Sequence, residues 1–177
     1  MEIAAHRLVD AAQVDSPNFN ARPHGEISLI VIHGISLPPG EFGGPMIEAL
    51  FTNSLDPGQT DLAELASMRV SSHLLIRRDA QLIQFVPFDA RAWHAGVSSF
   101  NGRSDCNDFS VGVELEGTDE LPYTDAQYGV LAQVCRTLMN MYGVRDIVGH
   151  SDIAPGRKTD PGPAFDWFRL KRGIAAS

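Results

Sequence analysis

The sequence predicts an α/β (α+β) fold, in which helices pack on a mixed central β-sheet. Three segments carry this prediction: an apolar, β-branched run at 27–32, a strictly alternating run at 110–116, and a long amphipathic helix that begins at Thr124. Strands that alternate with helices, with few hairpins among them, imply a mixed sheet. The 177 residues contain no repeat or low-complexity tract, so we expect a single domain over 1–177, packed from about Arg7 to Ile174.

The first predicted strand covers residues 27–32. Its near-continuous apolarity indicates a central strand that is covered on both faces, and His33-Gly34 should end it, which places His33 at its exit. A Pro/Gly-rich loop follows at 37–44. Pro45 can then occupy the first turn of a short helix that reaches about Phe51, and Asp61 is a candidate cap for another short helix.

Residues 70–77 and 81–86 predict two strands of a hairpin joined at Asp79-Ala80. The second turn position lacks the glycine that a type I′ turn favours, so the turn type stays open. The next strand, 110–116, alternates with period two. Glu114 and Glu116 therefore lie on one side of it, opposite its apolar residues.

The helix at Thr124 is the most clearly marked helix in the sequence. Thr124 and Gln127 form a capping box, and Gly143 ends the helix. Its apolar stripe, which we assign to the core, comprises Tyr128, Leu131, Ala132, Cys135, Leu138, Met139 and Tyr142. Residues 146–149 predict a short strand that delivers His150. A terminal helix is expected at 163–172, with Phe165, Phe168 and Trp167 turned inward.

Composition narrows the functional classes. The net charge of −8, without a dense basic cluster, argues against nucleic acid as a partner. Cys106 and Cys135 are isolated, which indicates neither a disulfide framework nor a Cys-x-x-Cys metal site and favours a reducing compartment. No segment resembles a signal peptide or a membrane span, so we expect a cytoplasmic protein with no membrane partner, and a monomer.

The loop at 149–163 concentrates charged and ligating side chains. His150 and Asp160, together with His33, would give three protein ligands for a catalytic zinc, leaving the fourth position to water. Glu114 is the candidate base, and Lys158 the candidate partner of the oxyanion. Each residue also has a structural explanation, since a lone histidine after a strand is usually structural and an aspartate before proline often belongs to a turn.

Four segments, 31–44, 91–98, 106–119 and 149–167, resemble the zinc-dependent amidase_2 family, and within it the cytoplasmic enzymes acting on 1,6-anhydro-N-acetylmuramyl-L-alanine. Peptidoglycan recognition proteins and T7-type lysozymes share that fold. The resemblance covers nearly the whole chain. It implies zinc held by His33, His150 and Asp160, with Glu114 as acid/base and Lys158 steadying the transition state.

The resemblance also implies the reaction. The substrate would be a 1,6-anhydro-N-acetylmuramyl peptide, cut at the amide between the muramic acid and L-alanine during cell-wall recycling, which lowers the muropeptides that induce β-lactamase. Gly34 departs from the family, because many members have asparagine there. Asp152 has no role in the family pattern and lies only two residues from His150, so we exclude it as a ligand.

Some assignments stay open at this stage. Trp93 could stack on a sugar and Arg103 could bind a peptide carboxylate, or they could be a core tryptophan and a solvated arginine. His73 is expected to be a partly buried, hydrogen-bonded strand residue, and His94 is unassigned. Two other functions compete: a peptidoglycan-binding module without catalysis, and an amidase that attacks the intact wall.

Overall fold

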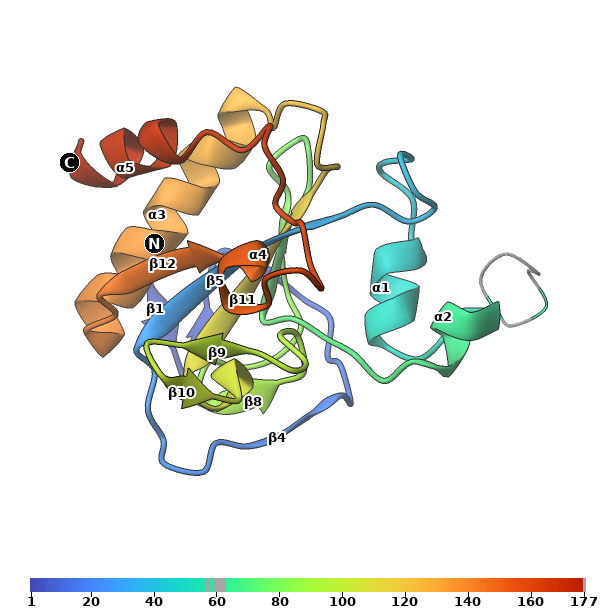
Figure 1. The fold of residues 1–177 in the computed structure, drawn as a ribbon, viewed down its shortest axis with the longest axis horizontal. Coiled ribbons are helices and arrows are strands. Elements are labelled where there is room, and N and C mark those ends of the chain that lie inside the picture. The colour runs from blue at the N-terminus through green and yellow to red at the C-terminus, as the bar shows by residue number, and fades with distance from the viewer. Residues whose placement is uncertain (57, 59–62, 177) are drawn as a thin grey trace.

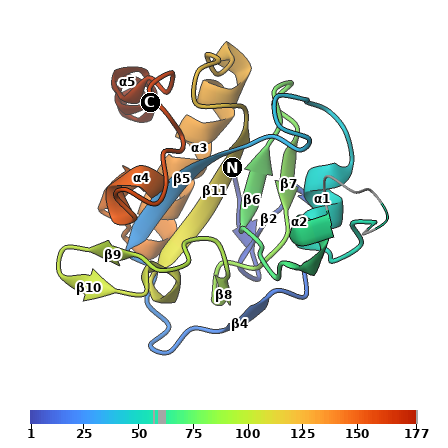
Figure 2. The same ribbon diagram turned by 45° about the vertical axis from the view of Figure 1, so that its right-hand side comes forward.

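A six-stranded mixed sheet forms the centre of the molecule (Figures 1 and 2). This computed structural model describes residues 1–56, 58 and 63–176. Neighbouring strands are parallel except β6 and β7, which form the predicted hairpin. In spatial order the strands are β12 (Asp146–Gly149), β5 (Leu29–Ile35), β11 (Ser110–Glu116), β6 (Leu74–Ile76), β7 (Leu82–Gln84) and β3 (Ala12–Gln13).

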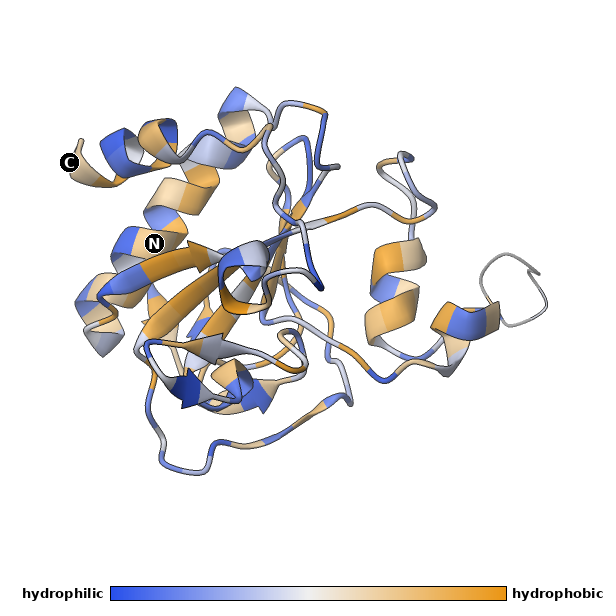
Figure 3. Ribbon diagram, in the orientation of Figure 1, coloured by the Kyte–Doolittle hydropathy of each residue, from blue (hydrophilic) through white to orange (hydrophobic). Residues whose placement is uncertain are grey.

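The two faces of the sheet are covered differently. On one face, residues such as Ile30, Ile32 and Val113 pack against α3 (Asp125–Tyr142) and α5 (Trp167–Ala175). The opposite face carries α1 (Met46–Phe51) beyond β6 and β7, with α2 (Ala63–Ser67) beside it, and α4 (His150–Ile153) beside β5. The central strands are largely apolar, as Figure 3 shows. His33 and Glu114 alternate with the residues that face α3, so both belong to the second face.

Strand β5 is longer than predicted. It continues through His33 and Gly34 to Ile35, because β11 pairs with it in parallel along the whole length, with Leu115 opposite Gly34. The expectation that His33 lies at the strand's exit is therefore wrong by two residues. His33 is instead held inside the strand, where backbone pairing on β11 fixes its position.

Helix α3 confirms its prediction, and the hairpin is present with shorter strands than predicted, Leu74–Ile76 and Leu82–Gln84. Thr124 caps α3 with the full capping box, and Gly143 ends it in the left-handed conformation. In the hairpin, Ala80 has a φ of 73°. Helix α1 begins at Met46 with Pro45 as its N-cap, one residue later than predicted. The expected cap at Asp61 lies outside the described residues.

The C-terminal helix differs from its prediction. It begins at Trp167 because the Asp166 side chain caps it by accepting from the Arg169 N–H. Leu170 is the buried residue of this helix, whereas Phe168 is 69% exposed, so its predicted inward position is wrong. Phe165 is buried, but it precedes the helix.

Among the residues that the structure describes, six further strands of two or three residues form three small antiparallel pairs, which the sequence did not indicate. They are β1 (Ile3–Ala4) with β2 (Arg7–Leu8), β4 (Phe19–Ala21) with β8 (Ala90–Ala92), and β9 (Ser99–Phe100) with β10 (Arg103–Ser104). A 3-10 turn at Cys106–Asp108 leads into β11. Among the described residues, no helix is both long enough and apolar enough to cross a membrane.

Glu116, on the same face as Glu114, is a structural carboxylate. It is buried, and its Oε1 accepts hydrogen bonds from Arg77 Nη1 at 2.9 Å and from the Gly43 N–H at 2.7 Å. The guanidinium of Arg77 also pairs with Glu48 of α1 at 2.5 Å. Glu116 thus ties the loop before α1 to the sheet.

Removing the Glu116 carboxylate should destabilise the fold without touching the ligating residues. We expect Glu116→Ala to lower the free energy of unfolding by about 1–3 kcal/mol, because the N–H groups of Gly43 and Arg78 lose a buried acceptor while Arg77 keeps only Glu48 as a partner. Urea unfolding of the variant and the parent measures the difference. Glu120→Ala, at an exposed carboxylate, is the control and should stay within about 0.5 kcal/mol of the parent. An equally small effect at Glu116 would contradict this role.

Candidate metal centre

Three segments that are distant in the sequence bring His33, His150 and Asp160 together. His33 lies on β5, and β12 pairs with β5 so that Gly149 is opposite Ile32, which places His150 beside His33. Asp160 follows on the loop after α4. Its backbone carbonyl accepts from the Ser151 N–H, and the carbonyl of Pro161 accepts from the Tyr123 hydroxyl at 3.0 Å, so the loop is fixed on both sides.

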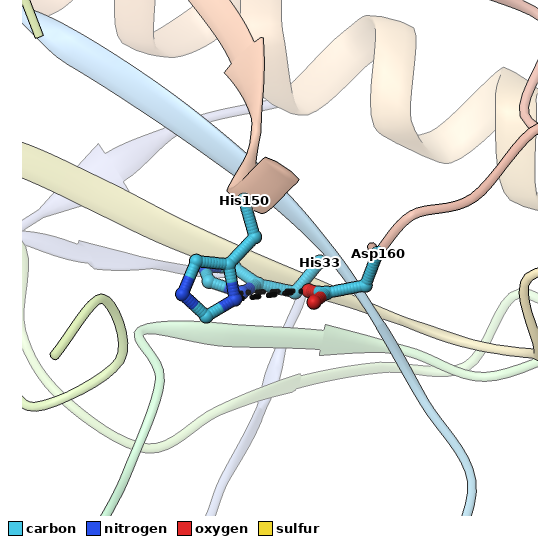
Figure 4. Close-up of side chains that lie close together, drawn as sticks. All are labelled: His33, His150 and Asp160. Atoms are coloured by element: carbon cyan, nitrogen blue, oxygen red, sulfur yellow. Dashed lines mark hydrogen bonds and ion pairs between the residues drawn. The ribbon is translucent and has the colours of Figure 1, made fainter. Parts of the chain in front are cut away.

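The three side chains point at one another (Figure 4). His33 Nδ1 lies 2.9 Å from His150 Nδ1 and 3.2 Å from Asp160 Oδ2, and the two atoms of His150 and Asp160 are 3.1 Å apart. Two ring nitrogens and a carboxylate that face one another expose converging lone pairs, an arrangement that a cation stabilises. Zinc bound to such atoms at about 2.0–2.2 Å would separate them by roughly 3.3–3.6 Å, so the set fits with a small outward movement. Within the described chain this is the one grouping of three ligating side chains.

The electrostatics of the cluster favour the protonation states of His33 and Asp160 that can bind a metal ion. Burial lowers the pKa of His33 to about 4, although the adjacent Asp160 carboxylate acts to raise it, so the ring is neutral near pH 7. Burial acts to raise the pKa of the Asp160 carboxyl, but its close contacts with His150 and His33 outweigh burial and hold this pKa well below its usual range. Neutral imidazoles and an ionised carboxylate are the species that bind metal ions.

Glu114 lies next to the three ligating side chains. It is the direct neighbour of His33 across the β5–β11 pair, and its Oε1 is 4.0 Å from His33 Nδ1. Burial raises its pKa well above the usual range, and the charge of Asp160 raises it further, whereas Lys158 lowers it. A carboxyl group whose pKa is raised in this way holds a proton more readily and can still release it, as a general acid/base requires.

The cluster lies in a pocket of about 200 Å³. One wall is apolar and is formed by Leu50, Phe51, Leu65, Met68 and Val70. Trp93 and Lys158 also line the pocket, and Trp93 Nε1 donates to Asn20 Oδ1 at 2.7 Å. Larger hollows exist elsewhere, such as one of about 540 Å³ beside Met1 and α3, but the ligating chemistry lies in this pocket.

Two other charged residues from the sequence analysis lie outside this pocket. Arg103, on β10, binds both carboxylate oxygens of Glu26 at 2.9 Å and stacks over the Phe109 ring. It lines a different hollow, near β9 and β12. Asp152 accepts from the Gly149 N–H at 2.7 Å and so caps α4, with its side chain engaged away from the cluster.

The structure also explains what occupies the space beside Gly34. A Cβ atom added there would lie 2.4 Å from the Tyr123 hydroxyl oxygen. An asparagine therefore fits only if Tyr123 moves. In this chain the position next to His33 is filled by the phenol that holds Pro161.

The remaining buried histidines differ in their contacts. His73 is fully buried rather than partly buried, and it lies just before β6 instead of inside a strand. Its Nδ1 accepts from the Gly112 N–H at 3.0 Å, which confirms that it is hydrogen-bonded. His94, which the sequence left unassigned, contacts His33 Nε2 through its Nδ1 at 2.9 Å. No spacing in the sequence signals this contact, because it depends on how the segment before β9 folds over β11.

Comparison with known proteins agrees with this geometry. The chain matches the Amidase_2 family, described as N-acetylmuramoyl-L-alanine amidase, over residues 23–163. The chain belongs to this amidase family. The match includes all three ligating residues, Glu114 and Lys158.

Individual amidases are similar over nearly the whole chain. A 1,6-anhydro-N-acetylmuramyl-L-alanine amidase AmpD from Salmonella typhimurium strain SL1344 is 60% identical over 96% of this chain and 93% of its own length. The AmpD of Escherichia coli K12 is also 60% identical, over 93% and 92%. A crystal structure of a selenomethionine AmpD derivative superposes with a TM-score of 0.96 at 54% identity, covering 98% of this chain and 99% of that one.

A more distant amidase has been solved with a ligand. The Escherichia coli amidase AmiD, in complex with the substrate anhydro-N-acetylmuramic acid-L-Ala-D-γ-Glu-L-Lys, has a TM-score of 0.61 at 29% identity. The alignment covers 94% of this chain and 60% of AmiD. AmiD, which shares the fold described here, thus has a structure with a bound muropeptide.

Proposed function

We propose that this amidase hydrolyses the amide between 1,6-anhydro-N-acetylmuramic acid and L-alanine in muropeptides, as a step of cell-wall recycling in the cytoplasm. The observation that carries the proposal is the set of His33, His150 and Asp160 beside Glu114 in one pocket. The choice of substrate rests on the AmpD relatives and on the muropeptide bound by AmiD. We treat residues 1–177 as one catalytic domain.

We assign zinc as the ion, held by the two histidines and Asp160. Two imidazoles and one carboxylate are a ligand set that catalytic zinc uses, with one position left for water or substrate. When bound, zinc acts as a Lewis acid and lowers the pKa of water to about 7. The remaining chemistry falls to the side chains around it.

Glu114 and Lys158 have complementary parts in this proposal. Glu114 takes the proton of the attacking water and returns it to the amine of L-alanine as that group leaves. Lys158 faces the oxyanion that develops on the scissile carbonyl. Trp93 and the apolar wall would contact the sugar or the stem peptide. Arg103 could bind a peptide carboxylate only if that carboxylate displaced Glu26, so we leave Arg103 out of the proposed site.

Peptide release distinguishes the competing functions. The protein is offered anhydro-muramyl tripeptide and its reducing counterpart, and free peptide is measured by mass spectrometry. We expect faster release from the anhydro form, loss of release after chelation, and recovery when zinc is added. Equal or faster release from the reducing form would favour an amidase of the intact wall. Tight binding without release would identify a binding module and overturn the proposal.

Lys158 should affect both the rate and its pH dependence. The ammonium group lowers the pKa of Glu114, so Lys158→Met raises that pKa further. A base is active only when deprotonated, and the acid limb of kcat/KM should therefore move to higher pH. We also expect kcat to fall about tenfold, less than for an enclosed donor, because Lys158 is exposed.

The pH profile of kcat/KM measures this shift. Lys171→Met, on the exposed side of α5, removes the same charge outside the pocket and should leave the profile unchanged. An acid limb that stays in place in Lys158→Met, or moves to lower pH, would remove Lys158 from this role.

A further inference from the structure

The segment from Trp93 to Ala95 lies against the far side of both histidine ligands. His33 and His150 point Nδ1 toward the ligand cluster, which leaves each Nε2 on the opposite edge of its ring. His33 Nε2 is 2.9 Å from His94 Nδ1, and His150 Nε2 is 3.1 Å from the carbonyl oxygen of Ala95. A histidine that binds a metal through one nitrogen carries its proton on the other, and that N–H needs an acceptor.

The acceptor for the His150 Nε2 proton is the Ala95 carbonyl. Arg157 Nη2 lies 3.5 Å from the same nitrogen, but its two hydrogens go to the carbonyl oxygens of Ala95 and Val97, each at 2.7 Å. A carbonyl oxygen only accepts, so His150 must place its proton on Nε2 and keep the Nδ1 lone pair for the ion. Ala95 is held in place from two sides. Arg157 Nη2 donates to the Ala95 carbonyl at 2.7 Å, and Asn107 Oδ1 accepts from the Ala95 N–H at 2.8 Å.

For His33 the direction of the hydrogen bond follows from the next two contacts. Ser110 Oγ lies 2.6 Å from the carbonyl oxygen of Cys106, so the single hydroxyl proton goes there. Ser110 Oγ is also 3.1 Å from His94 Nε2. Because its proton is already used, Ser110 Oγ must accept a hydrogen bond from that nitrogen. His94 then carries its proton on Nε2, and its Nδ1 is an acceptor. His33 must donate from Nε2, which leaves its Nδ1 lone pair free.

We propose that His94 is a positioning residue of the metal centre, which fixes the ring orientation and the tautomer of His33 through the chain Ser110, His94, His33. The inference rests on the metal site proposed above and is independent of the substrate. It extends the centre to a segment that contributes no ligand.

Two features of the fold are built around the His94 ring. Asn107 Oδ1 accepts from the His94 N–H at 3.1 Å, as it does from that of Ala95, so one side chain sets the backbone of both acceptor residues. Gly112 leaves room for the ring on β11, because a Cβ atom there would lie 2.5 Å from His94 Cγ. Gly112 and Glu114 lie on the same side of β11. Gly112 leaves space for the His94 ring, and Glu114 lies beside His33.

A pair of nearly isosteric variants separates positioning from packing. In His94→Asn the side-chain Oδ1 can take the place of His94 Nδ1 as acceptor, whereas His94→Leu has a similar shape and no acceptor. Zinc affinity is measured by competition with a chromophoric chelator. We expect His94→Leu to bind zinc about 10–100-fold more weakly than the parent and His94→Asn to stay within about threefold of it. Equal weakening in both variants, or in neither, would overturn the proposal.

A second variant keeps the test decisive if His94→Leu does not fold. Ser110→Ala leaves the rings of His94 and His33 in place. It removes the acceptor that keeps the His94 proton on Nε2, and it should weaken zinc binding about tenfold. Unchanged affinity in Ser110→Ala would contradict the directional chain. The parent protein is the reference for both sets of variants. If the parent binds no zinc, the proposed function itself fails. If the parent binds zinc and the variants bind it equally well, only the positioning role of His94 is refuted.

Discussion

Replacing Glu114 with glutamine should reduce turnover by on the order of 100-fold or more while zinc stays bound. Glutamine keeps the size of the side chain and its place beside His33 on β11, but it cannot take up and return a proton. The Glu114 Oε1 lies 4.0 Å from His33 Nδ1 and is not one of the three ligating atoms. Replacing the Glu114 carboxylate should therefore leave the ion in place. Peptide release and elemental analysis, performed on the same preparation, measure the two quantities.

The control for this variant is Glu41→Gln, which removes one exposed carboxylate from the loop before α1. It should keep both turnover and zinc. Turnover near the parent level in Glu114→Gln would exclude Glu114 as the acid/base, and loss of zinc would show that it is needed for the ion as well.

Asp160→Asn should abolish both zinc binding and activity. Asp160 provides the only carboxylate of the triangle, and an amide oxygen is a far weaker donor to zinc than an ionised carboxylate. With two histidines left, the site falls below the three protein ligands of a catalytic zinc. After desalting, we expect the zinc content to drop from about one ion per chain to near zero, with no measurable peptide release.

Asp152→Asn is the matched control, because it makes the same chemical change in the same 149–163 segment, within α4. Asp152 caps α4 through the Gly149 N–H, and an asparagine oxygen can still accept that bond. Zinc should stay bound in this variant. If Asp152→Asn loses the ion and Asp160→Asn keeps it, the assignment of the third ligand is reversed.

The features predicted well from the sequence are those set by nearby residues. The capping box of α3 and the alternation of β11 are local patterns, and the structure reproduces both. The end of β5 depended on a distant strand, because β11 pairs with Leu29–Ile35 and so extends the strand past His33. An inward Phe168 follows from the spacing only if Phe165 lies in the same helix, and the cap at Asp166 leaves Phe165 outside it.

The site shows the same division between local and distant information. The sequence singled out His33, His150, Asp160 and Glu114 as chemistry-bearing residues at strand ends and in a loop, and the structure brings them together. It could not find the contact of His94 with His33, or the pairing of Arg103 with Glu26, since neither follows from spacing along the chain. Both contacts depend on how the 93–105 segment lies across the sheet.

The apolar wall of the pocket belongs to a different part of the core from the strands that carry the ligands. Leu50 and Phe51 of α1 pack with Leu75 and Ile83, whereas β5 and β11 pack against α3 through their other face. For protein engineering, this separation makes the wall the region to randomise. Variants at Leu65, Met68 and Val70 should change the preference for the sugar or the stem peptide. Their zinc affinity should stay that of the parent protein.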